Sequence, residues 1–260
     1  MTNRADLESV ELKYETVARR IDHSLLGPTL TDDELIAGCE LAARYDVASV
    51  CIKPYAVKLA GEVLKGTNVA VGTTIGFPHG GHATSVKLFE VDQACSDGAA
   101  ELDMVINIGR AIAGDWKHVH EEIDLIVKRA HDRGAIVKVI FENCYLTDAQ
   151  KIRLCEICGE ARADYVKTST GYGSGGAVHE DLKLMRRSSP SWVKLKAAGG
   201  IRDLAASLAV IELGCDRIGA SRTAEILDAL RDRLDPARGK ILLAQETHAK
   251  TENRIDPGGY

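Results

Sequence analysis

The sequence predicts a single TIM (β/α)8 barrel, and three observations lead to this fold class. Short apolar segments alternate with amphipathic helical segments about eight times along the chain, a pattern typical of parallel strands joined by helical crossovers. The length of 260 residues matches the roughly 250 residues of one such barrel. The chain has neither a GxGxxG after its first strand nor a GxxxxGKS/T anywhere, so the usual nucleotide-binding fingerprints are missing.

The eight predicted strands are short and apolar. In chain order they are 20–25, 47–52, 69–75, 101–106, 135–141, 164–170, 193–198 and 216–221. Amphipathic segments follow them, and several begin after a threonine or aspartate that can cap the first helical turn. The predicted helices are Asp32–Tyr45, Tyr55–Lys65, Thr84–Asp97, His118–Arg133, Asp148–Ala161, His179–Arg187, Asp203–Leu213 and Thr223–Arg231.

The two ends of the chain lie outside this repeat. The N-terminal segment is charged and lacks the apolar core of a signal peptide. Its apolar residues nevertheless predict a helix that caps the barrel: Leu7, Val10, Leu12, Tyr14 and Val17. We expect one domain over residues 1–243, followed by a polar, mobile tail over 244–260.

Composition and charge narrow the partners and the compartment. A formal net charge of −5 argues against a nucleic-acid or membrane partner but allows a local basic pocket for an anionic metabolite. No stretch approaches the ~20 apolar residues that span a bilayer. Seven cysteines, an odd number without a signal peptide, indicate reduced thiols in the cytoplasm. The CxxC formed by Cys155 and Cys158 lies on a helical pattern, which favours a structural reading over a redox or metal role.

Two lysines stand out because they lie inside apolar strands. Lys167 in ADYVKTSTG and Lys196 in SWVKLKAAGG would each cost several kcal/mol if buried in the charged form. Reactive side chains of a barrel gather at the C-terminal ends of its strands. Strand alternation turns both lysines inward there, together with Asp103 in ELDMVI. Lys194 shares the face of Lys196 but lies one layer lower, near the rim where the strand begins.

This arrangement predicts nucleophilic chemistry. A second ammonium about 5 Å away, at an effective dielectric near 20, repels the first by roughly 3 kcal/mol. That repulsion lowers the lysine pKa by about 2, and desolvation lowers it further. We therefore expect Lys196 to hold down the pKa of Lys167, whose neutral amine can attack a carbonyl and form a Schiff base. Asp103 is the candidate proton relay.

Three further strand-end residues are candidates for the pocket. Asp22 is read either as a capping or pairing residue or as a substrate ligand. Cys51 is read either as a small buried hydrophobe or as a pocket-lining residue. Lys138 also faces inward, as a charge partner for Asp103 or Asp22 that helps to bind substrate.

The other half of the site is expected to bind a phosphate. Glycines between a strand and a helix allow a close backbone approach, and helix N-termini favour anions. The loops after the seventh and eighth strands are the usual phosphate position in barrels. The candidate residues are Gly199, Gly200, Gly219 and Ser221, with Thr170 and Gly171 on the neighbouring loop.

These motifs resemble the 2-deoxyribose-5-phosphate aldolase family of class I aldolases. The matching segments are IDHSLL, SVCIKP, VGTTIGFPHG, GAAELDMVINIG, VKVIFE, DYVKTSTGYGSGG, KAAGGIRD and DRIGAS, between about residues 20 and 231. The resemblance implies a cytoplasmic TIM-barrel lyase of deoxyribonucleotide catabolism. Such an enzyme reversibly cleaves 2-deoxy-D-ribose 5-phosphate to D-glyceraldehyde 3-phosphate and acetaldehyde.

The resemblance also assigns roles to single residues. It makes Lys167 the Schiff-base lysine, Lys196 the lysine that perturbs it and Asp103 the proton relay. Asp22 becomes a pocket aspartate near a sugar hydroxyl and Cys51 an aldehyde-sensitive pocket cysteine. The phosphate loops are matched by Gly171, Gly199, Gly200 and Ser221.

The chain departs from the family pattern at three positions. Gly27 replaces a frequent lysine, Lys53 replaces a frequent asparagine, and Tyr172 stands where phenylalanine or lysine is common. Some members end in a tyrosine whose tail folds over the site, and this chain ends in Tyr260, so we expect a tail contact there. Barrels of this kind often pair through their outer helices, which leads us to expect a homodimer.

No metal or cofactor is expected. The eight histidines include no HxH or HExxH pair, and His79 and His82 only flank two glycines in a loop. Three alternatives stay open at this point: an imine-forming aldolase for another phosphorylated sugar, a non-catalytic sugar-phosphate sensor, and an acid–base isomerase or synthase.

Overall fold

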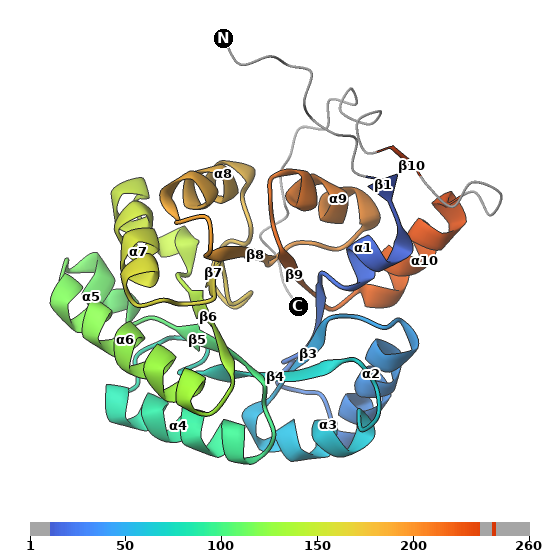
Figure 1. Cartoon of the computed structure of the whole chain (residues 1–260), viewed down its shortest axis with the longest axis horizontal. Helices are drawn as coiled ribbons and strands as arrows, with labels where there is room; N and C mark the ends of the chain where they lie inside the picture. Colours follow the sequence, from blue (N-terminus) through green and yellow to red (C-terminus); the bar gives the residue numbers. More distant parts are fainter. Residues whose placement is uncertain (1–10, 235–240, 243–260) are drawn as a thin grey trace, which may run out of the picture.

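The computed structural model describes residues 11–234 and 241–242, and a closed barrel of eight parallel strands forms its centre (Figure 1). The order around the barrel follows the chain from β2 to β9, and β9 pairs with β2 to close it. The strands are β2 (Ile21–Leu25), β3 (Ser49–Ile52), β4 (Ala70–Ile75), β5 (Glu101–Val105), β6 (Ile136–Ile140), β7 (Tyr165–Lys167), β8 (Lys194–Ala198) and β9 (Arg217–Ala220). The predicted TIM barrel is confirmed.

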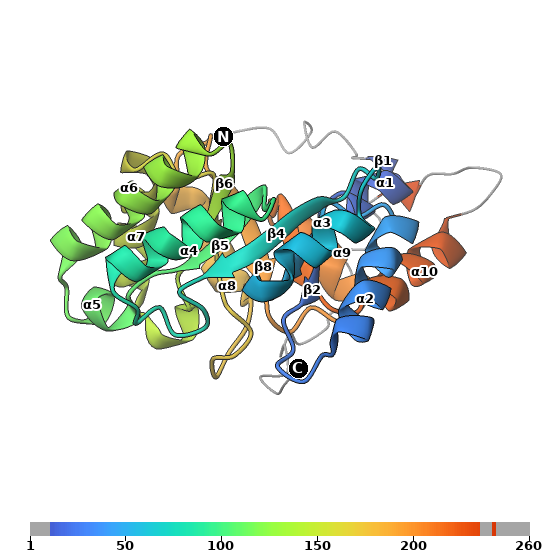
Figure 2. The ribbon, with the colours of Figure 1, turned by 90° about the horizontal axis from the view of Figure 1, so that it is seen from below.

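Helices surround the barrel as an outer ring (Figure 1). They are α2 (Asp32–Arg44), α3 (Val57–Val63), α4 (Thr84–Ser96), α5 (Ile108–Ile112), α6 (Trp116–Asp132), α7 (Asp148–Glu160), α8 (His179–Ser188), α9 (Leu204–Glu212) and α10 (Thr223–Arg233). Two 3-10 turns, η1 (Pro54–Ala56) and η2 (Asn143–Tyr145), follow β3 and β6. In the side view of Figure 2 the loops after β2 and β7 project from the same edge of the barrel.

Local sequence explains where several helices begin. Thr31 and Thr147 each accept a hydrogen bond from the backbone N–H three residues later, and Glu34 and Gln150 bind back to the threonine N–H. These capping boxes satisfy backbone donors that the first helical turn leaves unpaired. Asp203 caps α9 in the same way, through Ala206 N.

The predicted elements differ from the observed ones mainly at their ends. β7 ends at Lys167, whereas the sequence extended that strand to Thr170. The chain forms α5, which was not predicted, and α6 begins at Trp116 because Asp115 caps it through His118 N. Both differences reflect local capping that hydrophobic periodicity does not report.

The predicted N-terminal capping helix is shorter than expected. Tyr14 and Val17 lie in α1 (Tyr14–Ala18), but Leu12 lies in β1 (Glu11–Leu12), which pairs antiparallel with β10 (Ile241–Leu242). Leu7 and Val10 lie outside the described residues, as does the predicted tail over 244–260.

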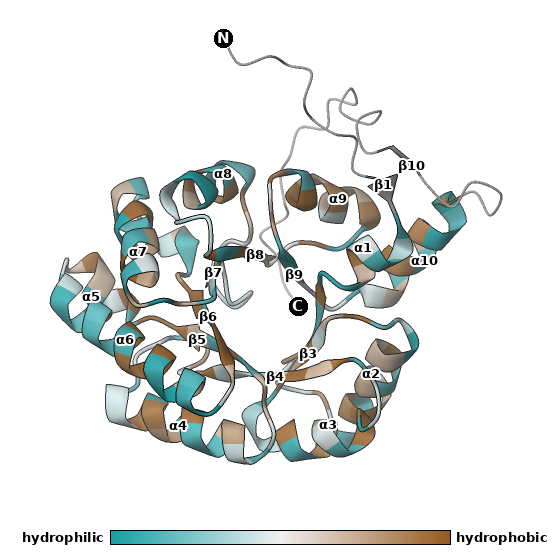
Figure 3. Ribbon diagram, in the orientation of Figure 1, coloured by the Kyte–Doolittle hydropathy of each residue, from teal (hydrophilic) through white to brown (hydrophobic). Residues whose placement is uncertain are grey.

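The hydrophobic core lies between the strands and the helices. Outward-facing strand residues such as Leu102, Met104, Val166 and Leu195 are fully buried there. Figure 3 shows the helices alternating between hydrophilic and hydrophobic colour, as amphipathic helices do, while β4 to β6 are largely hydrophobic. The inward-facing positions of the same strands carry the charged side chains described below.

Candidate active site

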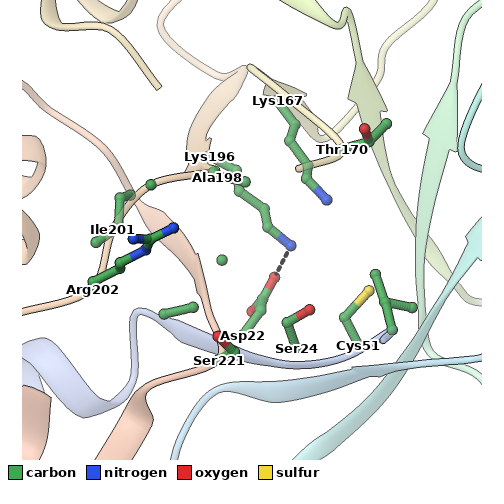
Figure 4. Close-up of a pocket in the computed structure, with 15 residues that line it drawn as sticks. Asp22, Ser24, Cys51, Lys167, Thr170, Lys196, Ala198, Ile201, Arg202 and Ser221 are labelled. Carbon is green, nitrogen blue, oxygen red and sulfur yellow. Dashed lines mark hydrogen bonds and ion pairs between the residues drawn. The ribbon is translucent and has the colours of Figure 1, made fainter. Parts of the chain in front are cut away.

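A pocket lies at the C-terminal ends of the strands (Figure 4). Its lining combines five strand or strand-end residues with two glycine-containing loops. These are Asp22, Cys51, Lys167, Thr170 and Lys196, with the segments 198–202 and 219–221 that run from the ends of β8 and β9 into the following loops. Ser24 and Leu26 complete it on the side of β2.

Lys167 is the last residue of β7 and is 3% exposed. Its Nζ donates a hydrogen bond to Asp103 Oδ2 at 2.6 Å. Burial is the largest influence on this group, and it lowers the pKa of Lys167 even though the Asp103 carboxylate acts in the opposite direction. The Lys196 ammonium also lowers the pKa, but by less. The sequence argument gave Lys196 the leading part, and that order is wrong, because loss of hydration acts more strongly on this amine.

Lys196 lies beside Lys167 in the register of β7 and β8. Its Nζ donates to Asp103 Oδ2 at 2.7 Å and to Asp22 Oδ2 at 2.5 Å. Burial favours its neutral form, but the carboxylates of Asp103 and Asp22 together outweigh burial and raise the pKa of Lys196. The two amines therefore share one carboxylate oxygen, yet their pKa values are shifted in opposite directions.

Asp103 is fully buried on β5 and connects three lysines. Oδ2 accepts from Lys167 and Lys196, and Oδ1 accepts from Lys138 Nζ at 2.9 Å. Burial alone would raise its pKa, but the three ammonium groups hold the pKa of Asp103 well below its usual range. An ionised carboxylate in this position can accept a proton and pass it on.

Asp22 lines the pocket, but its carboxylate is already engaged within the barrel. It accepts hydrogen bonds from Ser49 Oγ at 2.8 Å, from Lys196 and from Arg217. Burial opposes ionisation, yet Lys138, Lys196 and Arg217 hold the pKa of Asp22 far below its usual value. Asp22 therefore positions Lys196 directly, while its contact with substrate stays a prediction.

Lys138 has the charge partners that the sequence predicted. Its Nζ contacts Asp103 and lies 3.2 Å from Asp22 Oδ2, and it also donates to Glu101 Oε2 at 2.6 Å. Lys138 is not among the residues that line the described pocket, so the structure places it beneath the pocket and gives no support to its expected contact with substrate.

The sequence analysis missed two charged residues that contact Asp22 or Lys138 beneath the pocket, Glu101 and Arg217. The Arg217 guanidinium donates to both oxygens of Glu101, at 2.9 and 3.0 Å, and to Asp22. Each lies two residues before a strand-end candidate, so the period-two alternation of strands could have found them. Lys194 lies at the rim as predicted, exposed, with its Nζ 5.5 Å from the centre of the Tyr165 ring.

Cys51 on β3 points into the same space as Lys167 (Figure 4). It is a free, buried thiol, and burial raises its pKa to about 11. The group is therefore an uncharged lining residue at neutral pH. Cys155 and Cys158 are buried within α7 with pKa values raised by burial, which agrees with their structural reading.

The other end of the pocket has the glycines expected for a phosphate. Gly199 and Gly200 have positive φ angles of 87° and 81°, and a Cβ on Gly199 would lie only 2.8 Å from Gly176 Cα. Gly219 and Ser221 line the same end. Gly171 does not line the described pocket, so its predicted phosphate contact has no support here.

Arg202 also lines this end of the pocket, and the sequence analysis did not single it out as a site residue. A guanidinium between two glycine loops is a strong ligand for a phosphate group. Its place directly after the predicted glycine loop, in GGIR, was the signal that could have found it.

Lys53 and Tyr172, two of the three residues that depart from the family pattern, hold the loop after β2. Lys53 Nζ donates to the carbonyl oxygen of Leu30 at 2.7 Å, and the Tyr172 hydroxyl donates to that of Leu26, also at 2.7 Å. The Tyr172 ring also packs edge-on against Phe77 at 5.3 Å. Lys53 does not line the described pocket, and Gly27 lies in the loop that these residues hold.

Glu142 is a second buried acid near Lys167 that the sequence analysis did not select. It has a left-handed backbone, with φ 57°, and accepts hydrogen bonds from the backbone N–H and hydroxyl of Thr170. Burial raises the pKa of Glu142. The residue fixes the start of the loop after β7.

The described residues contain no group of three or more His, Cys, Asp or Glu side chains placed to hold a metal ion. Within the same residues, no helix has the length and apolar character needed to cross a membrane. Tyr260 lies outside the described residues.

A closed barrel with a buried amine at the mouth of its pocket defines an aldolase-type site. The model of the DeoC/LacD family of aldolases matches residues 16–221, and the chain belongs to this family. A deoxyribose-phosphate aldolase of Rhodopirellula baltica is 54% identical over 224 residues, which cover 86% of this chain and 93% of the relative. One of Thermococcus gammatolerans is 49% identical, over 83% of this chain and 97% of the relative.

Solved structures agree with this assignment. The deoxyribose phosphate aldolase of Aeropyrum pernix, described as a tetramer, superposes with a TM-score of 0.79 at 30% identity, over 85% of this chain and 93% of its own. An aldolase named QR15 gives the same TM-score at 38% identity, over 84% and 96%.

Proposed function

We propose that this chain reversibly cleaves 2-deoxy-D-ribose 5-phosphate to D-glyceraldehyde 3-phosphate and acetaldehyde, through an imine on Lys167. The observation that carries the proposal is the shared carboxylate of Asp103, which contacts both a Lys167 amine of lowered pKa and a cationic Lys196. The curated relatives named deoxyribose-phosphate aldolase support the choice of substrate.

The reaction begins when the neutral amine of Lys167 attacks the open-chain aldehyde carbon of the sugar. The nitrogen, cationic after the attack, passes one proton through Asp103 to the new alkoxide, which gives the carbinolamine. Lys196 can donate a second proton to the carbinolamine hydroxyl, which departs as water and leaves a protonated imine. The protonated imine then withdraws electrons from the sugar chain.

Bond cleavage follows from that withdrawal. The C3 hydroxyl gives up its proton through the Asp103 relay, the C2–C3 bond breaks, and its electron pair forms the C1=C2 bond of an enamine while the iminium electrons return to nitrogen. Glyceraldehyde 3-phosphate departs, the enamine is protonated on carbon, and water hydrolyses the imine to acetaldehyde and free Lys167. Every step uses protons that the Asp103–Lys196 pair or solvent can supply, so no cofactor is invoked.

The phosphate is assigned to the opposite end of the pocket. Backbone N–H groups of the Gly199–Gly200 loop and of Ser221 suit its oxygens, and the Arg202 guanidinium supplies the countercharge. This arrangement would leave the aldehyde end of an extended sugar beside Lys167.

Borohydride trapping tests the proposal. Reduction in the presence of acetaldehyde or deoxyribose 5-phosphate should attach the adduct to Lys167, located by peptide mass spectrometry. An unlabelled Lys167 in active enzyme refutes the assignment. The unphosphorylated sugar, run beside the phosphorylated one, tests the phosphate site, and kcat/KM over a panel of sugar phosphates tests the substrate. A non-catalytic sensor would show no retro-aldol turnover, and an acid–base isomerase or synthase no trapped adduct.

Three expectations stay predictions alongside this function. They are a cytoplasmic location, a homodimer, and a contact of Tyr260 with the site from a tail that follows a single domain over residues 1–243. Light scattering of the purified chain tests the dimer, and removal of Tyr260 with a comparison of kcat tests the tail contact.

A further inference from the structure

The interior of this barrel holds a buried cluster of seven charged side chains. Such interior layers are commonly filled by Val, Ile and Leu, and apolar replacements of buried ion pairs are often at least as stable. Stability alone therefore does not explain why the members that do not line the pocket are charged. The seven residues are Asp22, Glu101, Asp103, Lys138, Lys167, Lys196 and Arg217.

The charges of this cluster balance only if one cation is neutral. Three carboxylates, those of Asp22, Glu101 and Asp103, face four basic groups. A net charge inside a low-dielectric interior is unfavourable. The neutral member should therefore be the basic side chain whose charged form the carboxylates stabilise least.

The contacts identify that side chain. Within the described residues, Lys138 pairs with Glu101, Asp103 and Asp22. Lys196 pairs with Asp22 and Asp103, and Arg217 with Asp22 and Glu101. Lys167 pairs with Asp103 alone, and it shares that carboxylate with both other lysines.

We propose that Glu101 and Arg217 are positioning residues for the imine-forming amine. Their opposite charges cancel in the part of the cluster that lies beneath the pocket, so that Lys167 is the member that releases its proton. This inference rests on the proposed function, because it explains how that function obtains a neutral nucleophile. Neither residue lines the described pocket, and both act through Asp22 and Lys138. The released proton leaves to water through the open pocket.

Two further titratable groups near Lys167, Cys51 and Glu142, form no ion pair with the cluster within the described residues. Cys51 is a neutral thiol below about pH 11. Glu142 binds Thr170, and burial raises its pKa. No other ion pair with Lys167 is present in the described part of the chain. The charged and titratable groups that act on Lys167 directly are Asp103 of β5, Lys196 of β8, Cys51 of β3 and Glu142 after β6. The other members of the cluster connect to Lys167 through Asp103 and Lys196: they are Asp22 of β2, Glu101 of β5, Lys138 of β6 and Arg217 of β9.

The test measures the fraction of Lys167 that acetaldehyde and cyanoborohydride trap as a function of pH. The midpoint, which is the pH at which half of Lys167 is trapped, is then compared between each variant and the wild type. Arg217→Gln should move this midpoint upward by roughly one pH unit, the size expected for one charge acting through a few side chains at an effective dielectric near 20. Glu101→Gln should move it downward by a similar amount. The double variant, which again has balanced charges, should return towards the wild-type midpoint.

Two further variants separate charge from structure. Arg217→Lys keeps the positive charge and should keep the wild-type midpoint. Lys194→Gln removes a positive charge from an exposed position on β8, where solvent screens it, and should also leave the midpoint unchanged.

The outcomes distinguish this inference from the proposed function. If wild-type Lys167 is trapped but the single variants do not shift in opposite directions, or the double variant is not restored, the inference is overturned and the function stands. If wild-type Lys167 is not trapped, the proposed function fails first. Should Arg217→Gln fail to fold by circular dichroism, the downward shift of Glu101→Gln and the unshifted Arg217→Lys decide the matter.

Discussion

Two buried lysines in this molecule resemble each other closely and have different uses. Lys87 lies on α4, fully buried, and its Nζ donates to Glu122 Oε2 of α6 at 2.9 Å and to the carbonyl oxygen of Val105 at 2.8 Å. Burial lowers the pKa of Lys87, as it does for Lys167. Each lysine has one carboxylate partner within the described residues.

The difference lies in the surroundings of that pair. Lys87 does not line the described pocket, and the Glu122 carboxylate that pairs with it also accepts a hydrogen bond from the backbone N–H of Asn107. Lys167 lines the pocket, and its carboxylate is shared with Lys196 and Lys138. A depressed lysine pKa is therefore not enough to mark a nucleophile; access to substrate and a shared proton acceptor are what set Lys167 apart.

The largest expected effect comes from removing the reactive amine. Lys167→Met should lower kcat by at least roughly 10⁴-fold, as for loss of other covalent nucleophiles, and should abolish the trapped adduct. A coupled assay of glyceraldehyde 3-phosphate release measures this. Turnover near the wild-type rate would remove Lys167 from the mechanism and end its contrast with Lys87.

Asp103→Asn tests the part played by the shared carboxylate, because it removes the negative charge and keeps the shape of the side chain. We expect kcat to fall by about 10²- to 10⁴-fold, the usual range for loss of a general acid–base group. Imine trapping and turnover should be measured together. If kcat is unchanged, the proton relay must be assigned elsewhere.

Lys87→Met tests the other side of the comparison. It leaves the Glu122 carboxylate buried without its cation, which should reduce the free energy of unfolding by about 3–5 kcal/mol, or roughly 10 °C in Tm. The activity per folded enzyme should be unchanged. Urea unfolding and the aldolase assay measure the two quantities.

A double variant provides the control for Lys87→Met. Lys87→Met with Glu122→Leu removes both charges and should regain much of the lost stability. A marked loss of kcat in folded Lys87→Met protein would contradict the structural role given to this pair.

The smallest expected effect concerns the phosphate end of the pocket. Arg202→Gln should raise KM for deoxyribose 5-phosphate by roughly 10- to 100-fold, since a charge-assisted hydrogen bond contributes about 1.5–3 kcal/mol. Turnover of unphosphorylated deoxyribose should be unaffected. Equal losses with both sugars would place Arg202 in a general structural role.

Sequence periodicity was sufficient for much of the fold. Strands alternate with a period of two, so the inward direction of Asp103, Lys167 and Lys196 followed from their apolar neighbours. Helix starts were predictable where a threonine and a Glu or Gln stand three residues apart, as at Thr31 and Thr147. The short α5 and the start of α6 were not, because the Asn107 and Asp115 caps decided them.

The pattern of residues along the chain is enough to predict the barrel, the inward-facing lysines and aspartate, and the glycines that suit a phosphate. Which charges meet depends on how the chain folds. Lys196 and Asp22 are 174 residues apart in sequence, and Arg217 and Glu101 are 116 apart. Closure of the barrel sets the layer in which each strand places its side chains. Burial and ion pairing depend on that layer, so the protonation of Lys167 is a property of the folded barrel and cannot be read from its local sequence.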